Sequence, residues 1–420
     1  MPQPSPDTAG VRFLGERNDF FRLLARGSLF LMVTLGIYRF WLNTDVRRFL
    51  WSNTEVAGES LEYTGTPFEL LIGFLIAIAI LVPIYALLFL ATLQLGTIGQ
   101  FSGAIGFVLL TVLGQYAVYR ARRYRLTRTV YRGVRFHQDG SAWRYAVCAL
   151  FWWTLTILTV GLAYPWKESR LERFKMRNTY YGNVQGAFAS SGLRLFLRGL
   201  PMWIVVVLPL IAAVVAFPAT ADLSALKQAI AQGDGGADVM SRIEGANPQL
   251  YAVIVFAMLA GVWSMIMGAV LYPAFQAMLI RWWASGIRFG DLVVKSKLRT
   301  ASIYGGYMRC LGYSLLFSLF LGVVIGTLTV SLMGILGAIK SAPPQAKEIL
   351  TVGIGLISYV VSMLGYSAIY QSTVKFAFWR FGAESLELSG IHVLDQVQAT
   401  GGPSSPVGEG LADALNVGGF

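Results

Sequence analysis

The sequence predicts an all-α, polytopic membrane protein: a helix bundle of six to eight transmembrane segments. Two observations support this. Of 420 residues, 55% are apolar and only 13% are charged, about half the charged share of an ordinary soluble domain. The apolar residues also form runs long enough to cross roughly 30 Å of hydrocarbon at about 1.5 Å per residue.

A segment near the N-terminus occurs a second time. Thr34-Leu35-Gly36-Ile37 and Thr159-Val160-Gly161-Leu162 begin two stretches in which Thr, Gly, Trp, Arg, Phe, Asn and Thr recur at one constant spacing. This predicts an internal repeat within a membrane domain at 1–390. The first copy is expected at about 12–67 and the second at about 130–188, with fainter copies near 272–290 and 370–390.

Hydropathy predicts the crossing helices. Six runs are long enough to span, at approximately 68–96, 103–119, 195–217, 250–274, 308–338 and 350–372. Two further apolar stretches, 28–41 and 145–166, contain the repeated Thr-x-Gly segments. The number of crossings therefore depends on whether these two stretches span.

Basic residues test that choice, because short cytoplasmic loops collect Lys and Arg. If all eight stretches cross, either the basic segment 120–135 or the basic segment 167–177 lies outside. The conflict disappears if the Thr-x-Gly segments are re-entrant hairpins or interfacial helices, bent at Gly36 and Gly161. Six crossings then remain, and the basic loops and both termini are cytoplasmic. The alternative is that both are ordinary spanning helices that violate the rule.

Catalytic and metal-binding patterns are scarce. His137 and His392 are the only histidines and neither has a ligand-type partner at helical spacing. Nucleophile, metalloprotease and phosphate-loop motifs do not occur. We therefore expect no enzyme, no cofactor and no metal.

The arginines beside the apolar runs favour a membrane partner. The net charge of +12 would suit nucleic acid, but juxtamembrane basic clusters are attracted to anionic lipid, so we expect no nucleic-acid partner. Tryptophan prefers the headgroup layer. Candidate headgroup or interface residues, with anionic phospholipid as the expected partner, are Trp41, Arg47, Arg48, Trp166, Arg170 and Arg173.

Two functional classes stay open. One is a non-enzymatic membrane protein whose repeated basic elements bind anionic lipid or a protein partner. The other is a transporter or channel for a small solute or lipid, with the Thr-x-Gly segments lining its route. The pairs Asn53-Thr54 and Asn178-Thr179 are expected to cap a following helix, or else to hydrogen-bond a headgroup.

The end of the chain changes composition. Residues 391–420 contain Gly401-Gly402-Pro403-Ser404-Ser405-Pro406, which is typical of a flexible linker. A flexible C-terminal tail is expected there.

The repeated motif resembles that of the YjgN-like family. In the first copy it consists of Thr34-Leu35-Gly36-Ile37-Tyr38, Trp41, Arg47-Arg48-Phe49, Asn53-Thr54 and Tyr63-Thr64-Gly65-Thr66-Pro67. The second copy repeats it through Tyr164-Pro165-Trp166, Arg173-Phe174 and Asn178-Thr179. The resemblance implies a bacterial multi-pass inner-membrane protein built from a domain of unknown function, and it supplies no substrate or catalytic residue.

Overall fold

The computed structural model describes residues 7–94, 101–220, 231, 236–338, 344–402, 404–415 and 417. The chain divides into two compact units, one of residues 1–192 and 280–420 and the other of residues 193–279. The end of the first predicted span, at 95–96, and tail residues 403, 416 and 418–420 lie outside the described residues.

Six helical segments are long and apolar enough to cross a membrane, as expected for a multi-pass membrane protein. Their positions confirm the six long predicted spans. The helices are α3 (Pro67–Gln94), α5 (Ser102–Thr127), α8 (Gly192–Thr220), α11 (Pro248–Ala284), α12 (Thr300–Ala338) and α13 (Pro344–Tyr370). The last continues through the π-helix η1 (Gln371–Lys375) into α14 (Phe376–Glu384).

Four shorter helices contain the repeated motif. They are α1 (Arg17–Val33), α2 (Arg39–Ser52), α6 (Ala142–Leu158) and α7 (Tyr164–Arg177). The ring of Phe20 packs 5.3 Å from that of Phe49, and the ring of Phe30 packs 4.9 Å from that of Tyr38. Because the start of α1 meets the end of α2, these two helices form an antiparallel hairpin. At 17 residues each, α1 and α6 are at the lower limit of the roughly 17–25 residues that a crossing helix has.

An eleven-stranded antiparallel sheet corrects the expectation of an all-α fold, although the structure remains mostly helical. Its strands are β1 (Thr8–Phe13), β2 (Thr54–Val56), β3 (Glu59–Ser60), β4 (Glu62–Tyr63), β5 (Thr129–Tyr131), β6 (Val134–Gln138), β7 (Thr179–Tyr181), β8 (Val184–Phe188), β9 (Ile287–Phe289), β10 (Leu292–Ser296) and β11 (Leu386–Ser389). All belong to the first unit.

One pairing pattern recurs around this sheet. In β6, Val134 and Arg135 pair with β5 of the same hairpin, and Phe136 to Gln138 then pair with β7 of the next hairpin. The strand β8 divides its pairing in the same way between β7 and β9. The two ends of the chain complete the pattern, because β1 pairs first with β11 and then with β2.

The sheet closes on itself. Its first strand in spatial order is β3 and its last is β4, and only Leu61 separates these two in sequence. Leu61 N donates to Thr54 O over 3.0 Å. The two edges of the sheet therefore belong to one extended segment, and we call the closed structure the strand ring. Closure satisfies strand edges that would otherwise invite pairing with other chains.

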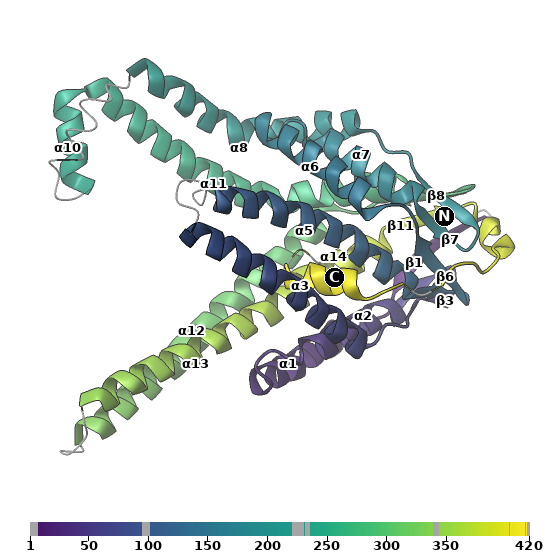
Figure 1. Cartoon of the computed structure of the whole chain (residues 1–420), viewed down its shortest axis with the longest axis horizontal. Coiled ribbons are helices and arrows are strands. Elements are labelled where there is room, and N and C mark those ends of the chain that lie inside the picture. Colours follow the sequence, from purple (N-terminus) through teal and green to yellow (C-terminus); the bar gives the residue numbers. More distant parts are fainter. Residues whose placement is uncertain are drawn as a thin grey trace. The chain divides into compact units, whose positions relative to one another are not determined.

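Chain connectivity links every helical hairpin to the strand ring at both ends. The short hairpin α1–α2 connects β1 to β2, and α6–α7 connects β6 to β7. Three long hairpins, α3–α5, α8–α11 and α12–α13, connect the remaining strand pairs. Figure 1 shows α12 and α13 running side by side.

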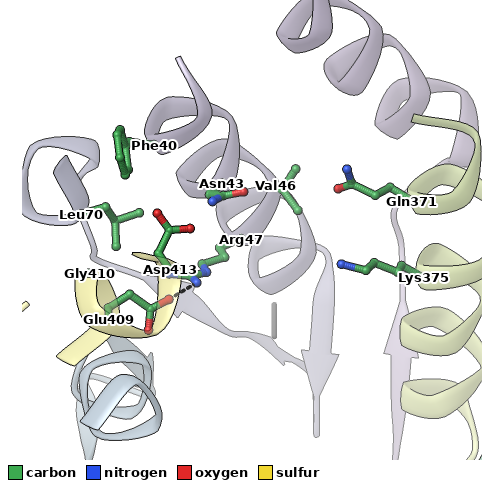
Figure 2. Close-up of a pocket in the computed structure, with 10 residues that line it drawn as sticks. All are labelled: Phe40, Asn43, Val46, Arg47, Leu70, Gln371, Lys375, Glu409, Gly410 and Asp413. Carbon is green, nitrogen blue, oxygen red and sulfur yellow. Dashed lines mark hydrogen bonds and ion pairs between the residues drawn. The ribbon is translucent and has the colours of Figure 1, made fainter. Parts of the chain in front are cut away.

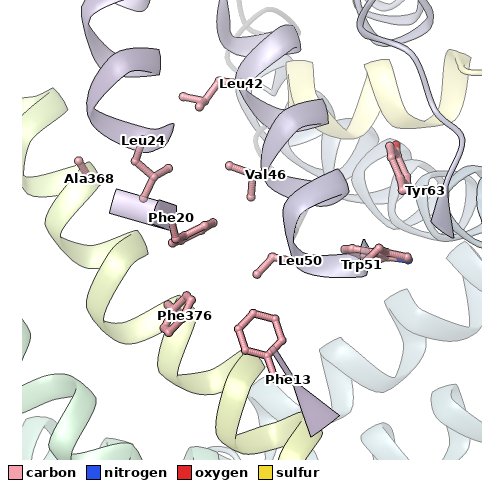
Figure 3. Packing of buried hydrophobic residues seen from close by; sticks show 10 residues of the cluster. All are labelled: Phe13, Phe20, Leu24, Leu42, Val46, Leu50, Trp51, Tyr63, Ala368 and Phe376. Atoms are coloured by element: carbon pink, nitrogen blue, oxygen red, sulfur yellow. The ribbon is translucent and has the colours of Figure 1, made fainter. Parts of the chain in front are cut away.

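The main core lies where the first short hairpin meets the strand ring and the last helices. Figure 3 shows Phe20 and Leu24 of α1, Leu50 of α2 and Phe376 of α14 pointing toward one another. Phe13 of β1 packs edge-on against Phe376, with ring centroids 5.5 Å apart. Both ends of the chain therefore contribute to one apolar cluster.

The second unit is a helical pair with a short helix. Ser264 Oγ on α11 donates to Val206 O on α8 over 2.6 Å, and Trp263 Nε1 donates to Val205 O over 3.0 Å. A small cluster around Ile243 of α10 (Gly236–Ala246) and Leu250 closes it. Polar bonds to backbone carbonyls are typical of packing between membrane helices.

The C-terminal segment is a second correction, because the described part of the predicted flexible tail is folded onto the first unit. It contains the 3-10 helix η2 (Ile391–Gln396) and the helix α15 (Val407–Ala414). Leu411 and Ala412 of α15 are buried in a cluster with Ala77 of α3 and Ala117 of α5. Gly408 and Gly410 permit this close approach, since a Cβ on Gly410 would overlap the backbone of Gly73.

Candidate functional site

The two Thr-x-Gly segments form the same tight turn. Gly36 and Gly161 have φ of +92° and +90°, and the residues before them, Leu35 and Val160, also have positive φ. Such values favour glycine, since a side chain is strained there. The threonine side chain braces each turn: Thr34 Oγ1 accepts from Tyr38 N, and Thr159 Oγ1 accepts from Ala163 N, both over 3.0 Å. Gly36 and Gly161 therefore lie at sharp bends.

Each turn carries an exposed apolar tip. Leu35 is 93% exposed and Val33 80%, while Leu158 is 75% and Ile157 72% exposed. Side chains of this kind at a helix tip suit a lipid environment better than water.

The Asn-Thr pairs end helices and begin strands, so the expectation that they cap a following helix is wrong. Asn53 Nδ2 donates to Phe49 O and Asn178 Nδ2 to Phe174 O, both over 2.7 Å. The threonines then start β2 and β7. Thr54 Oγ1 also accepts from Trp379 Nε1 over 2.9 Å, which ties the strand to α14.

Most of the predicted headgroup residues lie at the surface. Arg48, Arg170 and Arg173 are exposed. Trp166 is 37% exposed, and Trp41 is half-buried against the ring of Phe68, 5.5 Å away. The structure does not gather them in one pocket: they lie on α2 and α7, which occupy different parts of the strand ring's circumference.

Arg47 lies elsewhere, inside the protein. Its guanidinium is buried and donates to the Tyr63 hydroxyl over 3.0 Å and to the Glu409 carboxylate of α15. Figure 2 shows this pair, with Asp413 beside it on the same helix. Asp413 in turn pairs with Arg39. The C-terminal helix thus brings two carboxylates to the arginines of α2.

A cavity of about 150 Å³ adjoins this pair. Asn43 and Arg47 line it from α2, while Gln371 and Lys375 line it from η1 and point toward them in Figure 2. A π-helical turn within a long helix is rare and frequently marks a functional site. Polar and charged side chains from α2, η1 and α15 therefore meet at this cavity.

The surroundings stabilise the charge of Arg47 but not that of Asp413. Burial disfavours the Arg47 cation, but the Glu409 carboxylate and the Tyr63 hydroxyl outweigh burial and raise the pKa of Arg47 above its usual value. Burial raises the pKa of Asp413 above that of an ordinary aspartate, with Arg39 acting in the opposite direction.

A second buried charge cluster lies on α7. Glu172 pairs with Lys175 and accepts from Trp283 Nε1 over 3.1 Å. Burial opposes ionisation of Glu172, yet Lys175 and Arg122 outweigh it and lower the pKa of this carboxyl. Arg122 itself donates to Thr179 Oγ1 over 2.9 Å. These groups satisfy one another and brace the strand ring.

An apolar groove of about 480 Å³ is lined by residues of α1, α12 and α13. Arg17 and Asn18 line it together with apolar residues that include Phe21, Phe317 and Leu364. Arg17 donates to the Tyr313 hydroxyl over 3.3 Å. Sequence reasoning did not single out this groove, because its walls are about 300 residues apart in the chain.

Comparison with known proteins gives one family. Among the described residues, no group of three His, Cys, Asp or Glu side chains could hold a metal ion. No curated protein and no solved structure gives a significant match. The model of the family DUF898, described as bacterial protein of unknown function, matches residues 8–414, and the YjgN-like resemblance is consistent with it. Because this match covers almost the whole chain, the protein belongs to the DUF898 family of bacterial proteins of unknown function.

Proposed function

We propose that this protein is a non-enzymatic protein of the bacterial inner membrane that binds anionic phospholipid through arginines next to its strand ring. The observation that carries the proposal is the connectivity of the helices. Every helical hairpin begins and ends at a strand of the ring, so the basic segments around 120–135 and 167–177 both adjoin it.

Hairpin length supports the topology. Three long hairpins supply six helices that can cross, and the short hairpins α1–α2 and α6–α7 turn back at apolar tips. If each long hairpin crosses the bilayer twice and each short hairpin does not cross, the chain returns to the same side after every hairpin. The strand ring and both termini then lie on one side. The positive-inside rule favours the cytoplasm for that side. The Thr-x-Gly turns then enter the bilayer without crossing it.

Exposed arginines and the Arg17 groove support lipid as the ligand. Arg48, Arg170 and Arg173 are exposed, and each such charge near an anionic membrane surface contributes about 1 kcal/mol. The groove between α1 and α12 offers an apolar channel with an arginine at its wall, which matches an acyl chain below an anionic headgroup.

We further propose that the helical hairpin and the following β-hairpin form one repeated unit. The common Thr-x-Gly geometry and the shared strand-pairing pattern support this. Transport receives less support: the most apolar windows of α12 and α13 have no buried residues, so these described helices do not enclose a polar route.

Native mass spectrometry of lipid retained by the purified full chain tests lipid binding. Replacing Arg170 and Arg173 by Gln should weaken phosphatidylglycerol retention roughly five-fold per arginine, from about 1 kcal/mol each. The matched control is Arg242→Gln on α10, which lies between α8 and α11 and away from the strand ring in sequence. Equal phosphatidylglycerol retention by the unmodified protein, the variant with Arg170 and Arg173 replaced, and Arg242→Gln would contradict the proposal.

A further inference from the structure

The groove that holds α15 has more positive than negative charge. Arg39, Arg47, Arg125 and Lys375 lie in or beside it. The carboxylates that pair with the three arginines, Glu409 and Asp413, both belong to α15 itself. Without α15 the groove would present four cations from α2, α5 and η1.

The carboxylate of Glu409 fills this site incompletely. Its Oε1 accepts from Arg47, but its Oε2 accepts no hydrogen bond from any described residue and lies 3.9 Å from Arg125 Nε. That distance is too long for a hydrogen bond. A tetrahedral phosphate carries more acceptor oxygens than a planar carboxylate, and guanidinium groups bind phosphate well.

The groove is also pre-organised for an anion. Tyr63 holds one nitrogen of Arg47 while the other faces Glu409. The cavity beside the pair is already lined by the amides Asn43 and Gln371 and by Lys375. Hydrogen-bond donors therefore surround space that a carboxylate at the end of an α15 side chain leaves open.

The chain that carries α15 is suited to release. The segment before it, Gly401 to Pro406, has linker composition. Five of the eight residues of α15 are buried, but only two of these, Leu411 and Ala412, are hydrophobic. A tethered competitor of this size acts at an effective concentration in the millimolar range and is displaced by a tighter ligand.

We propose that the α15 groove is a binding site for the phosphate group of an anionic phospholipid, and that Glu409 and Asp413 occupy it as an intramolecular competitor. This inference rests on the proposed lipid-binding function and adds the site and its regulation. Lipid phosphate replaces the two carboxylates on Arg39, Arg47 and Arg125, and α15 leaves the groove.

Hydrogen exchange of α15 in the unmodified full chain tests this. The protein is placed in nanodiscs of phosphatidylcholine alone or with phosphatidylglycerol, and a third sample in phosphatidylcholine receives inorganic phosphate. We expect exchange across residues 407–414 to rise about ten-fold with phosphatidylglycerol, as displacement of a tethered competitor requires. If exchange also rises with inorganic phosphate, the groove binds phosphate both from lipid headgroups and from solution. Unchanged exchange in both samples overturns the inference.

A variant with both carboxylates neutralised gives an independent readout. The double substitution Glu409→Gln and Asp413→Gln should raise phosphatidylglycerol retention about ten-fold, because the competitor is weakened. Glu387→Gln, which removes the exposed partner of Lys297, is the matched control and should change nothing. If retention stays constant in the double variant while Arg170→Gln and Arg173→Gln reduce it, the groove inference fails and the proposed function stands. If no protein retains phosphatidylglycerol, the proposed function itself fails.

Discussion

The two short helical hairpins, α1–α2 and α6–α7, share one turn and carry buried charges of opposite sign at one equivalent position. Both turns pair a residue of positive φ with a glycine near +90°, braced by a threonine hydroxyl. At the spacing that relates the two motifs, however, Arg47 on α2 corresponds to Glu172 on α7. Both side chains are buried.

The ion-pair partners of Arg47 and Glu172 lie at different distances along the chain. Glu172 pairs with Lys175, three residues away on the same helix, and with Trp283. Arg47 pairs with Glu409, 362 residues away on α15. Glu172 thus has an ion-pair partner on its own helix, whereas the ion-pair partner of Arg47 comes from the C-terminal helix. We expect from this difference that only the first hairpin can exchange its charge partner without unfolding.

Removing the buried charges should show this asymmetry most strongly. Glu172→Ala leaves Lys175 and Arg122 without their carboxylate in a buried site, which costs about 3–5 kcal/mol. Arg47→Ala should cost only roughly 1–2 kcal/mol, an ordinary substitution effect, because Glu409 can leave with α15. Thermal unfolding in one detergent measures both.

Limited proteolysis or hydrogen exchange of α15 tests the same comparison between the two hairpins. Arg47→Ala should expose α15, whereas Glu172→Ala should not do so before global unfolding. Arg48→Ala, which changes the exposed neighbour of Arg47, serves as the control. Equal losses of unfolding free energy in Glu172→Ala and Arg47→Ala would contradict this expectation. They would show that the first hairpin depends on α15 for its stability as much as the second depends on Lys175.

Lowering the pH should destabilise the α6–α7 hairpin less than Glu172→Ala does, because protonation neutralises Glu172 but keeps its side chain in place. The pKa of this carboxyl is lowered in the folded protein, so it binds protons less well folded than unfolded. Its stabilisation is complete above its ordinary pKa and is lost as pH falls through its lowered folded pKa. The loss therefore begins near the ordinary glutamate pKa of about 4.3 and continues below it. Unfolding measured from neutral pH down through this range should show it, and Glu172→Gln should remove that part of the pH dependence. A pH profile identical in the unmodified protein and this variant would contradict the assignment.

Sequence patterns predicted those parts of the fold that local signals encode. Each of the six long helices is a continuous apolar run, and the Thr-x-Gly turns recur with glycine where φ is positive. The strand ring has no such signal. Its strands have two to six residues, too few for a clear alternation, and one of its pairings joins Thr8 of β1 to Ser389 of β11.

The candidate site was only partly predictable for the same reason. Arg48, Arg170 and Arg173 follow from their position beside apolar helices, and they are exposed as a headgroup site requires. The burial of Arg47 depends on Glu409, which lies in a segment with the composition of a linker. Composition alone did not predict the helix α15, whose eight residues fit between α3 and α5 through close glycine contacts.

The smallest expected effect tests what the two hairpins share. Gly36→Ala and Gly161→Ala each place a side chain at a φ near +90°, which costs about 1–2 kcal/mol of backbone strain. A Cβ at Gly36 would meet no atom within 4 Å, so strain alone should set the cost there. Because the two turns have the same backbone and the same threonine brace, we expect the two losses in unfolding free energy to agree within about 0.5 kcal/mol. Thr34→Val and Thr159→Val, which remove the brace and keep the glycine, should again give a matched pair. A loss confined to one hairpin would mean that the surroundings of α1 or α6, rather than the turn itself, hold that bend in place.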